Sequence, residues 1–315
     1  MFQNEKPWVS FCMSTYKRPE LLKKQLNSLS LQTFTNFEVV VSDNDPENSG
    51  RKIVQDLNDP RFKYFGNGVN LGMMQSFNLS IDRADADFIV MITDDDPVEK
   101  NFLSDIYNIY KQNNTYGLYA GFLRNNTSPE KIEYIKPEKF AEEILDPAKT
   151  KRILWSSCII KKNIAIEVGK IPDYGSPHLA DHAFIIMAGS INGGMVINKM
   201  FSTLTSHNTN FSKSNISYYQ TGCKGFFETL INFYKNTTRY KYIKIALNKH
   251  LRTWFITSIF TLKKHYTIVN KNNTILLEIK DCANSILQLH FMHRNRIKYN
   301  LKNLIFFAKR IFNLL

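Results

Sequence analysis

The sequence predicts an α/β protein: a mostly parallel, Rossmann-like sheet flanked by helices over residues 1–210, followed by a basic helical extension over residues 211–315. Two observations lead to this prediction. Strand-like and helix-like segments alternate through the first hundred residues, and such alternation favours a parallel sheet covered on both faces. The last hundred residues are instead rich in Tyr, Phe, Leu, Ile and Lys, with few glycines or prolines.

The first part of the predicted sheet contains four strand–helix pairs. Short apolar runs, several of them β-branched, are expected to be strands, and apolar residues at helical spacing indicate helices. Pro19 stands where the first turn of a helix tolerates proline, and residues 43–46 (DNDP) form a turn after the second strand. In chain order, strands are predicted at residues 8–14, 37–42, 61–65 and 87–92, and helices at residues 19–31, 47–57, 72–82 and 99–111.

The rest of the chain is less regular. Strands are expected at residues 118–123, 153–160 and 195–204, with a helix at residues 178–190 that a glycine pair ends. Residues 219–262 and 274–315 are predicted to be helical.

Polar residues follow three of the predicted strands. Thr15, Asp43 and the triplet Asp94–Asp96 each lie at or just past the carboxyl end of a different strand. Right-handed crossovers bring the carboxyl ends of parallel strands to one edge of the sheet, where ligands bind. We therefore expect these residues to meet, although they are far apart in sequence.

The Asp94–Asp96 triplet has two interpretations. Adjacent carboxylates repel one another, and Mg²⁺ or Mn²⁺ would relieve that repulsion. The alternative is a solvated acidic turn at the start of the next helix, where aspartates are favoured. Since the sequence has no P-loop and no G-x-G-x-x-G motif, phosphates would be held mainly through the metal.

Four segments in a fixed order resemble the family-2 inverting glycosyltransferases, which have the GT-A fold. The resemblance extends over residues 8–210. It implies a metal-dependent hexosyltransferase with Mn²⁺ or Mg²⁺ as cofactor, a catalytic domain over residues 1–210 and a nucleotide-sugar donor, usually a UDP-sugar. The segments are residues 9–19 (VSFCMSTYKRP), 32–43 (QTFTNFEVVVSD), 70–72 (NLG) and 94–96 (DDD).

The resemblance also implies roles for individual residues on the donor side. Asp96 would be the direct metal ligand in an Asp-x-Asp motif with Asp94, and Asp95 would belong to the donor site. Two positions depart from the family: Lys17 stands where Asn is common, and residues 43–45 (DND) replace Asp-Asp-Gly-Ser. The remaining assignments are a nucleotide pocket lined by Thr15, Tyr16 and Arg18, a base contact at Asp43, and neighbours of the nucleotide and diphosphate at Asn70 and Gly72.

Three residues are candidates for catalysis and acceptor binding. Inverting transfer needs a carboxylate that accepts the proton of the acceptor hydroxyl, and Asp181 matches the second residue of the family's Glu-Asp pair, with Ala180 in place of the Glu. A helix-capping aspartate is the alternative. His207 resembles a late histidine that reaches the metal or the diphosphate, or else lies in a surface loop. Trp155 would be a wall of the acceptor site or a core residue.

The C-terminal extension carries the basic charge of the protein. Residues 211–315 hold 18 Lys and Arg against 3 Asp and Glu, whereas the first 210 residues are near −2. Apolar residues on one face of residues 301–315, with lysines among them, predict an interfacial amphipathic helix. Helices that only pack on the catalytic domain are the alternative.

Together these features predict an enzyme that adds a sugar to a lipid-linked glycan in bacterial surface polysaccharide synthesis. With no signal peptide, no spanning segment and four scattered cysteines, we expect it in the cytoplasm, peripheral on the inner face of the membrane. No nucleic-acid partner is expected. The alternatives are a sugar nucleotidyltransferase, which would need a glycine-rich phosphate loop, and a non-enzymatic protein whose basic extension binds nucleic acid or membrane.

Overall fold

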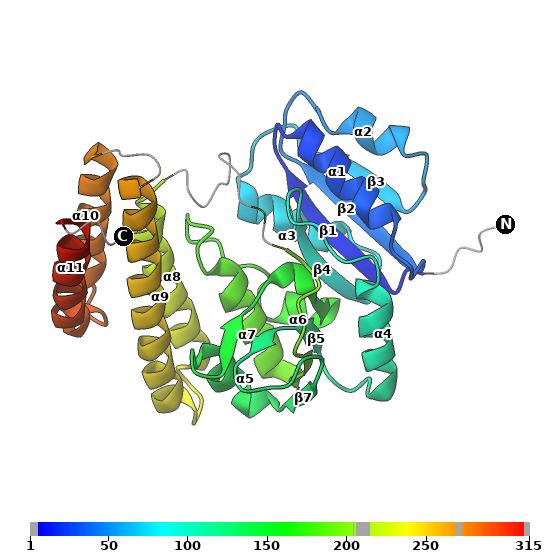
Figure 1. Ribbon diagram of the computed structural model, residues 1–315. Helices are drawn as coiled ribbons and strands as arrows, with labels where there is room; N and C mark the ends of the chain where they lie inside the picture. The colour runs from blue at the N-terminus through cyan, green and yellow to red at the C-terminus, as the bar shows by residue number, and fades with distance from the viewer. Residues whose placement is uncertain (1–5, 204, 206–214, 269–272, 312–315) are drawn as a thin grey trace. The chain divides into compact units, whose positions relative to one another are not determined.

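The computed structural model describes residues 6–203, 205, 215–268 and 273–311 (Figure 1). These residues form two compact units. The sheet unit takes the described residues of 1–144, 148–173 and 180–207, and the helical unit takes those of 145–147, 174–179 and 208–315. The prediction of a mostly parallel sheet flanked by helices, with helices at the C-terminus, is confirmed.

The sheet unit is built on an eight-stranded sheet with the strand order β3-β2-β1-β4-β9-β5-β10-β7. Its first four strands in chain order pair in parallel, and β9 pairs antiparallel with both β4 and β5. β10 pairs parallel with β5 and antiparallel with β7. The strands are β1 (Val9–Thr15), β2 (Phe37–Asp43), β3 (Phe62–Gly66), β4 (Phe88–Thr93), β5 (Leu118–Gly121), β7 (Ile132–Ile135), β9 (Cys158–Lys161) and β10 (Gly194–Ile197).

Helices cover both faces of the parallel half. All residues of β1 and β2 are buried, as expected for strands in the middle of a parallel sheet. One face packs with the apolar sides of α1 (Pro19–Ser30), α2 (Arg51–Asp56) and α4 (Phe102–Gln112) in a single buried cluster. The residues that α3 (Met73–Arg83) buries against β1 and β2 lie outside that cluster, so α3 covers the opposite face.

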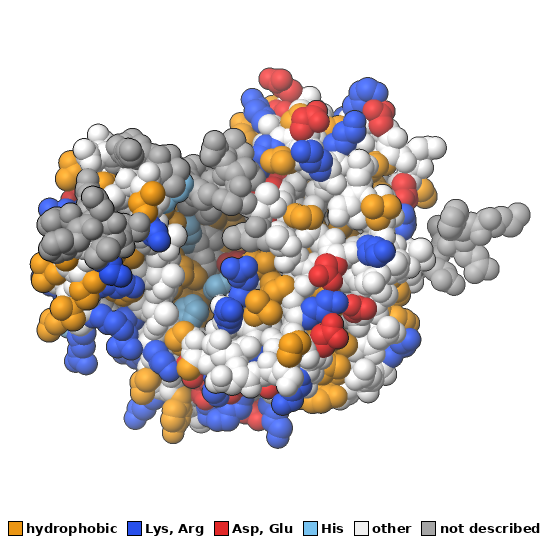
Figure 2. Space-filling view, viewed as in Figure 1, with side chains coloured by type: hydrophobic (Ala, Val, Ile, Leu, Met, Phe, Trp, Pro, Cys, Tyr) orange, Lys and Arg blue, Asp and Glu red, His pale blue; other side chains and the backbone are white. Residues whose placement is uncertain are grey.

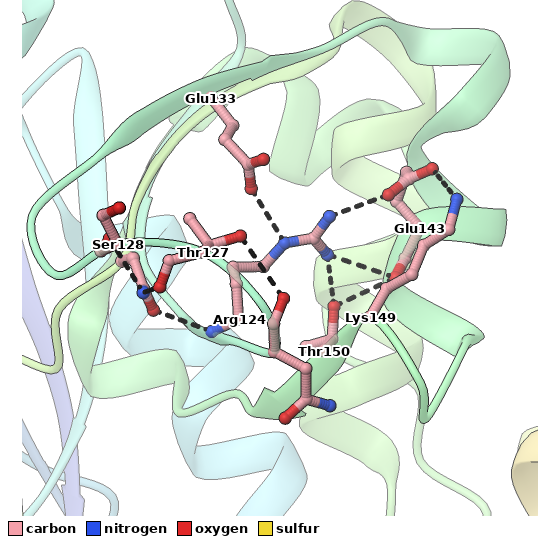
Figure 3. Close-up of polar contacts among 9 residues, drawn as sticks. Arg124, Thr127, Ser128, Glu133, Glu143, Lys149 and Thr150 are labelled. Atoms are coloured by element: carbon pink, nitrogen blue, oxygen red, sulfur yellow. Dashed lines mark hydrogen bonds and ion pairs between the residues drawn. The ribbon is translucent and has the colours of Figure 1, made fainter.

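Arg124 ties together the elements of the second half of the sheet unit (Figure 3). It lies in β6 (Leu123–Arg124), which pairs with β8 (Thr150–Arg152) in a small second sheet. Its guanidinium donates to Glu133 of β7 at 3.0 Å, to Glu143 of α5 (Pro137–Leu145) at 2.7 Å, and to Thr150. The strand expected at residues 118–123 is divided in the structure between β5, which ends at Gly121, and β6, which begins at Leu123.

The other predicted elements of the sheet unit occur in the expected order with shifted bounds, whereas β7, β8, α5 and α6 (Lys162–Glu167) were not predicted. A short 3-10 helix, η1 (Trp155–Ser157), precedes β9 where a continuous strand was expected. α6 comes next, and the expected helix at 178–190 is α7 (Ala180–Asn192). The last strand, β10, ends at Ile197, before the predicted end at residue 204.

The helical unit contains α8 (Tyr218–Tyr234), α9 (Tyr240–Ile268), α10 (Asn273–Gln288) and α11 (Arg296–Ile311), with the 3-10 helix η3 (His293–Asn295) before α11. α8 and α9 pack on each other and on α10. Within the described part of the chain, no helix combines the length and the apolar character needed to cross a bilayer. The four cysteines of the chain are all buried and unbridged.

Candidate functional site

The carboxyl ends of β1, β2 and β4 bring the polar residues of three strands to one edge. In the register, Thr15 lies opposite Asp43, and Ser14 lies opposite Thr93, which immediately precedes Asp94. Thr15 Oγ1 donates a hydrogen bond of 2.8 Å to Asp94 Oδ2. The structure thus gathers Thr15, Asp43 and Asp94 at a single strand edge, where parallel sheets bind their ligands.

Arg18 clamps two members of the aspartate triplet. It is the residue before Pro19 at the start of α1, and its guanidinium lies 3.0 Å from Asp94 Oδ1 and 3.0 Å from Asp95 Oδ2. Asp94 is 1% exposed, and burial raises the pKa of its carboxyl to about 6, while the charge of Arg18 and the hydrogen bond from Thr15 lower it. Arg18 therefore supplies positive charge against the carboxylate repulsion that, on the sequence alone, pointed to a metal.

Asp96 is held by a different part of the chain. Its Oδ1 accepts a hydrogen bond of 2.9 Å from the backbone N–H of Thr205, and its backbone carbonyl accepts one of 2.8 Å from Gln25 Nε2. The segment that leads to Thr205 runs along the residues after the triplet, with Thr203 N–H donating to the Pro97 carbonyl at 3.1 Å. The residues after β10 therefore return to the strand edge.

Asp43 and Asn44 fix the loop after β2. The Asp43 carboxylate is fully buried and accepts hydrogen bonds from Asp45 N–H, Gly50 N–H and the Tyr64 hydroxyl, all between 2.9 and 3.0 Å. The geometry gives Asp43 an evident role in holding this loop, and its contact with a base stays a prediction.

Asn44 joins the loop after β2 to the segment that precedes α3. Its side-chain amide donates to the Gly72 carbonyl at 3.0 Å, and its Oδ1 accepts from Asn67 Nδ2 at 2.9 Å. Asn70 Oδ1 accepts from Gly72 N–H at 3.0 Å. Gly72 has φ 83° and ψ 160°, a conformation that is essentially restricted to glycine, so the backbone itself requires glycine there.

Tyr16 lies at the start of the loop between β1 and α1. Its ring is 41% exposed, and the next residue, Lys17, has a φ of 53°. The left-handed conformation at Lys17 is one that Asn adopts more readily than most residues, which gives a physical reason for the Asn that is common at this position in the family that the sequence resembles. An exposed aromatic ring beside this edge is suited to stacking on a planar base.

The predicted catalytic residues lie on other elements. Asp181 is in the first turn of α7, with its Oδ2 4.0 Å from His182 Nε2. η1 packs against both β4 and α7, and its Trp155 ring lies 4.8 Å from that of Phe77. The helix that carries Asp181 is thus linked to β4 through η1, whereas Thr15, Arg18, Asp94 and Asp95 share hydrogen bonds and ion pairs. His207 lies outside the described residues.

The donor set at this edge fits a divalent cation only in part. Among residues 6–203, 205, 215–268 and 273–311, no group of three or more His, Cys, Asp or Glu side chains is arranged to hold a metal ion. Mg²⁺ and Mn²⁺ accept one or two carboxylates and leave other positions to substrate phosphates. Asp96 fits such a site as a single oxygen ligand, since Asp94 and Asp95 are paired with Arg18.

Sequence reasoning missed Asn44, Gln25 and Thr205 as residues that organise the site. Asn44 lies in the DND segment, whose departure from the family pattern was the available signal. Gln25 stands among leucines on the buried side of α1, and a polar residue on an apolar face indicates a specific hydrogen bond. Nothing in the sequence near Thr205 shows that its backbone N–H reaches Asp96.

Solved structures share the fold of this chain. The S. aureus protein TarS in complex with UDP-GlcNAc superimposes with a TM-score of 0.63 over 88% of this chain and 79% of that chain, at 17% identity. A mannosyltransferase from Pyrobaculum calidifontis in complex with GDP-Man and Mn²⁺ gives a TM-score of 0.54 over 96% of this chain and 88% of that one, at 15% identity.

Sequence relatives match part of this chain. A Campylobacter jejuni protein named GalNAc(5)-diNAcBac-PP-undecaprenol beta-1,3-glucosyltransferase is 32% identical over 118 residues, which are 36% of this chain and 38% of that protein. An Escherichia coli protein named UDP-Glc:alpha-D-GlcNAc-diphosphoundecaprenol beta-1,3-glucosyltransferase WfgD is 27% identical over 136 residues, 41% of this chain and 54% of that one. The matches thus span about half or less of these relatives' length.

The family model of glycosyl transferase family 2 matches residues 10–169, about half of the chain. The matched segment contains β1, β2 and β4 together with Thr15, Arg18, Asp43 and the Asp94–Asp96 triplet. The chain belongs to glycosyl transferase family 2.

Proposed function

We propose that this protein transfers a sugar from a nucleotide-sugar donor to a lipid-linked glycan during the synthesis of a bacterial surface polysaccharide. The observation that carries the proposal is the group formed by Thr15, Arg18, Asp94 and Asp95 at the carboxyl ends of β1 and β4, inside the segment that matches the family. The names of the C. jejuni and E. coli relatives, both acting on undecaprenol-linked acceptors, support the choice of acceptor.

We propose a UDP-sugar as the donor. The name of the E. coli relative specifies UDP-Glc, and TarS shares the fold with UDP-GlcNAc bound. In the proposed complex the base stacks on the exposed ring of Tyr16, and the loop that Asp43 and Asn44 hold together forms the floor of the nucleotide pocket. Asn70 and Gly72 flank the ribose and diphosphate.

Asp96 is the proposed ligand for Mn²⁺ or Mg²⁺, with His207 as a second. A bound divalent cation would neutralise charge on the departing diphosphate. Arg18 would hold Asp94 and Asp95 in place. Its positive charge would offset the repulsion between their carboxylates and the phosphates of the donor. Thr205 would hold one oxygen of Asp96, which orients the other toward the donor.

Asp181 is the proposed general base of an inverting displacement. The acceptor oxygen attacks C1 of the donor sugar, the bond between C1 and the diphosphate oxygen breaks, and the nucleoside diphosphate departs. The Asp181 carboxylate takes the proton from the acceptor hydroxyl. Trp155, which lies in η1 against β4 and α7, would form a wall of the acceptor site.

The helical unit is proposed to hold the protein at the inner face of the cytoplasmic membrane. Residues 211–315, which make up most of this unit, hold 18 Lys and Arg against 3 Asp and Glu, and this basic excess suits an anionic lipid surface. Exposed apolar side chains at Ile297, Leu301 and Leu304, spaced along one side of α11, would enter the headgroup region.

Two measurements separate donor binding from transfer. We would incubate the purified protein with UDP-sugars and Mn²⁺, and follow both the thermal shift on donor binding and the release of UDP. Asp96→Ala should abolish the Mn²⁺-dependent thermal shift, while Asp181→Asn should keep that shift and lose about 100-fold or more in UDP release.

The matched control is Asp56→Asn on the exposed side of α2, where Asp56 pairs with the exposed Lys52 at 3.0 Å. This variant should behave as wild type in both measurements. If Asp96→Ala and Asp181→Asn also behave as wild type, the assigned site is wrong. Release of pyrophosphate from a nucleoside triphosphate and a sugar phosphate would instead identify a nucleotidyltransferase.

A further inference from the structure

A pocket of about 460 Å³ opens in the helical unit, between α9, α10 and α11. Its volume is in the range of small-molecule sites, about 300–1,000 Å³. The pocket lies wholly within one compact unit and contains none of the residues assigned to sugar transfer. We call it the three-helix pocket, and its lining residues are Lys263, Thr267, Asn273, Leu276, Leu277, Lys280, Asn303, Phe306 and Phe307.

Lys263 is a buried cation whose partners in this pocket are neutral. Its side chain is 6% exposed, and its ammonium donates to the Tyr299 hydroxyl at 2.9 Å and to Asn303 Oδ1 at 2.7 Å. Burial and, to a smaller extent, the charge of Lys280 together lower the pKa of Lys263 to about 8. Buried charges in proteins are normally paired with an opposite charge, whereas the hydrogen-bond partners that the described residues offer this ammonium are neutral.

Lys280 adds a second positive charge to the same pocket, and none of the described residues that line it carries a carboxylate. The two acidic residues of α10, Glu278 and Asp281, are exposed and are not part of the lining. The pocket is therefore an electropositive site that favours an anion. A phosphate group, which accepts several hydrogen bonds at once, matches two lysines in this arrangement.

The remaining lining is apolar and continues to the surface. Leu276 and Phe306 line the pocket, and Leu277 and Phe307 at its rim are 62% and 47% exposed. Figure 2 shows apolar side chains interspersed with Lys and Arg over the region of α10 and α11 at the left of the view. Free inorganic phosphate would leave these rim side chains in water, whereas a phosphate with an attached hydrocarbon chain would cover them.

We propose that the three-helix pocket binds the headgroup of one anionic phospholipid, with Lys263 and Lys280 against the phosphate and Leu276, Leu277, Phe306 and Phe307 against the first part of the acyl chains. The site is independent of the sugar-transfer reaction. The pocket would bind a single anionic lipid molecule specifically. This binding would add to the nonspecific attraction between the basic surface of the helical unit and an anionic membrane.

The test is calorimetric titration of the full-length protein with dihexanoyl phosphatidylglycerol below its micelle concentration. Lys263→Met and Lys280→Met should each weaken binding by at least about tenfold, the effect of losing one charge-assisted hydrogen bond. Leu277→Glu should do the same through the rim, and because Leu277 is mostly exposed this variant cannot fail merely by unfolding the core. Lys264→Met, at the exposed neighbour of Lys263 on α9, is the matched control and should bind as wild type.

Three further ligands identify the source of the phosphate. Dihexanoyl phosphatidylcholine has the same chains without net charge, inorganic phosphate has no chains, and farnesyl diphosphate stands for a prenyl carrier. Each should bind at least about tenfold more weakly than phosphatidylglycerol. The proposal would be overturned if phosphatidylcholine or inorganic phosphate bound as tightly as phosphatidylglycerol, or if farnesyl diphosphate bound more tightly. Unchanged phosphatidylglycerol binding in Lys263→Met and Leu277→Glu would overturn it as well.

Discussion

Replacing Arg18 with Met tests the ion-pair group at the strand edge most sharply. Arg18 lies 3.0 Å from both Asp94 and Asp95, and the Asp94 side chain is fully buried. Removing one partner of a buried pair costs about 3–5 kcal/mol, because the remaining charge stays desolvated. The Arg18 side chain is 25% exposed, so water partly replaces it, and we expect the free energy of unfolding to fall by about 2–3 kcal/mol.

The assay is equilibrium urea unfolding of the wild type, Arg18→Met, Asp94→Asn and the double variant. Since the two side chains are in direct contact, their coupling energy should be about 1–3 kcal/mol. Arg18→Lys should recover part of the loss, because Lys carries the charge but not the two-pronged geometry. Lys52→Met, which removes an exposed ion pair on α2, is the control and should change stability by less than about 0.5 kcal/mol.

A loss below about 0.5 kcal/mol in Arg18→Met, or a coupling energy near zero, would refute this account. Either result would mean that the aspartates do not depend on Arg18 for their placement. A metal or another cation would then be needed to explain how the buried carboxylate of Asp94 is tolerated.

Three other changes have expected outcomes. Asn44→Ala removes the hydrogen bond to the Gly72 carbonyl and should raise KM for the donor several-fold with a stability loss of about 1–2 kcal/mol; an unchanged KM would separate this loop from the donor. Arg124→Met leaves the carboxylates of two elements without their shared guanidinium and should cost about 3 kcal/mol in urea unfolding, and a Tm equal to wild type would contradict the role given to this residue. The pKa of Lys263 is lowered from 10.5 to about 8 in the folded protein, so its burial disfavours folding below about pH 8 and this cost disappears as the pH rises toward 10.5. The Tm of the wild type should therefore rise relative to that of Lys263→Met between pH 7 and about pH 9.5, and a constant difference would show that the ammonium is not desolvated.

The sequence was sufficient to predict the order of the first four strands and helices, the helical C-terminal part and the polar residues at the strand ends, whereas β7, β8, α5 and α6 were not predicted. Short β-branched runs such as residues 37–42, followed by turn residues, favour buried strands, and parallel pairing then places Thr15, Asp43 and Asp94 at one edge. Element bounds were less predictable. α2 begins at Arg51, four residues after its expected start, because Asp43 accepts hydrogen bonds from Asp45 and Gly50 and holds the chain in a turn.

The contacts between distant segments could not be predicted from local patterns. The chain after β10 returns to Asp96 through the backbone of Thr205, and backbone hydrogen bonds leave no signature in residue types. Arg18 was expected in the nucleotide pocket, and its pairing with two aspartates depends on how α1 starts relative to β4. Lys263 is one of many lysines in a basic segment, and only the packing of three helices shows that it is buried.

The central claim is sugar transfer at the edge formed by β1, β2 and β4. The most direct test is the transfer of a radiolabelled sugar from UDP-sugar donors into an organic-extractable, undecaprenol-linked acceptor. We predict labelled lipid with the wild type and with Asp56→Asn, and at least about 100-fold less with Asp96→Ala. Undiminished labelling by Asp96→Ala, or no labelling by the wild type across the full panel of nucleotide sugars and acceptors, would contradict the account.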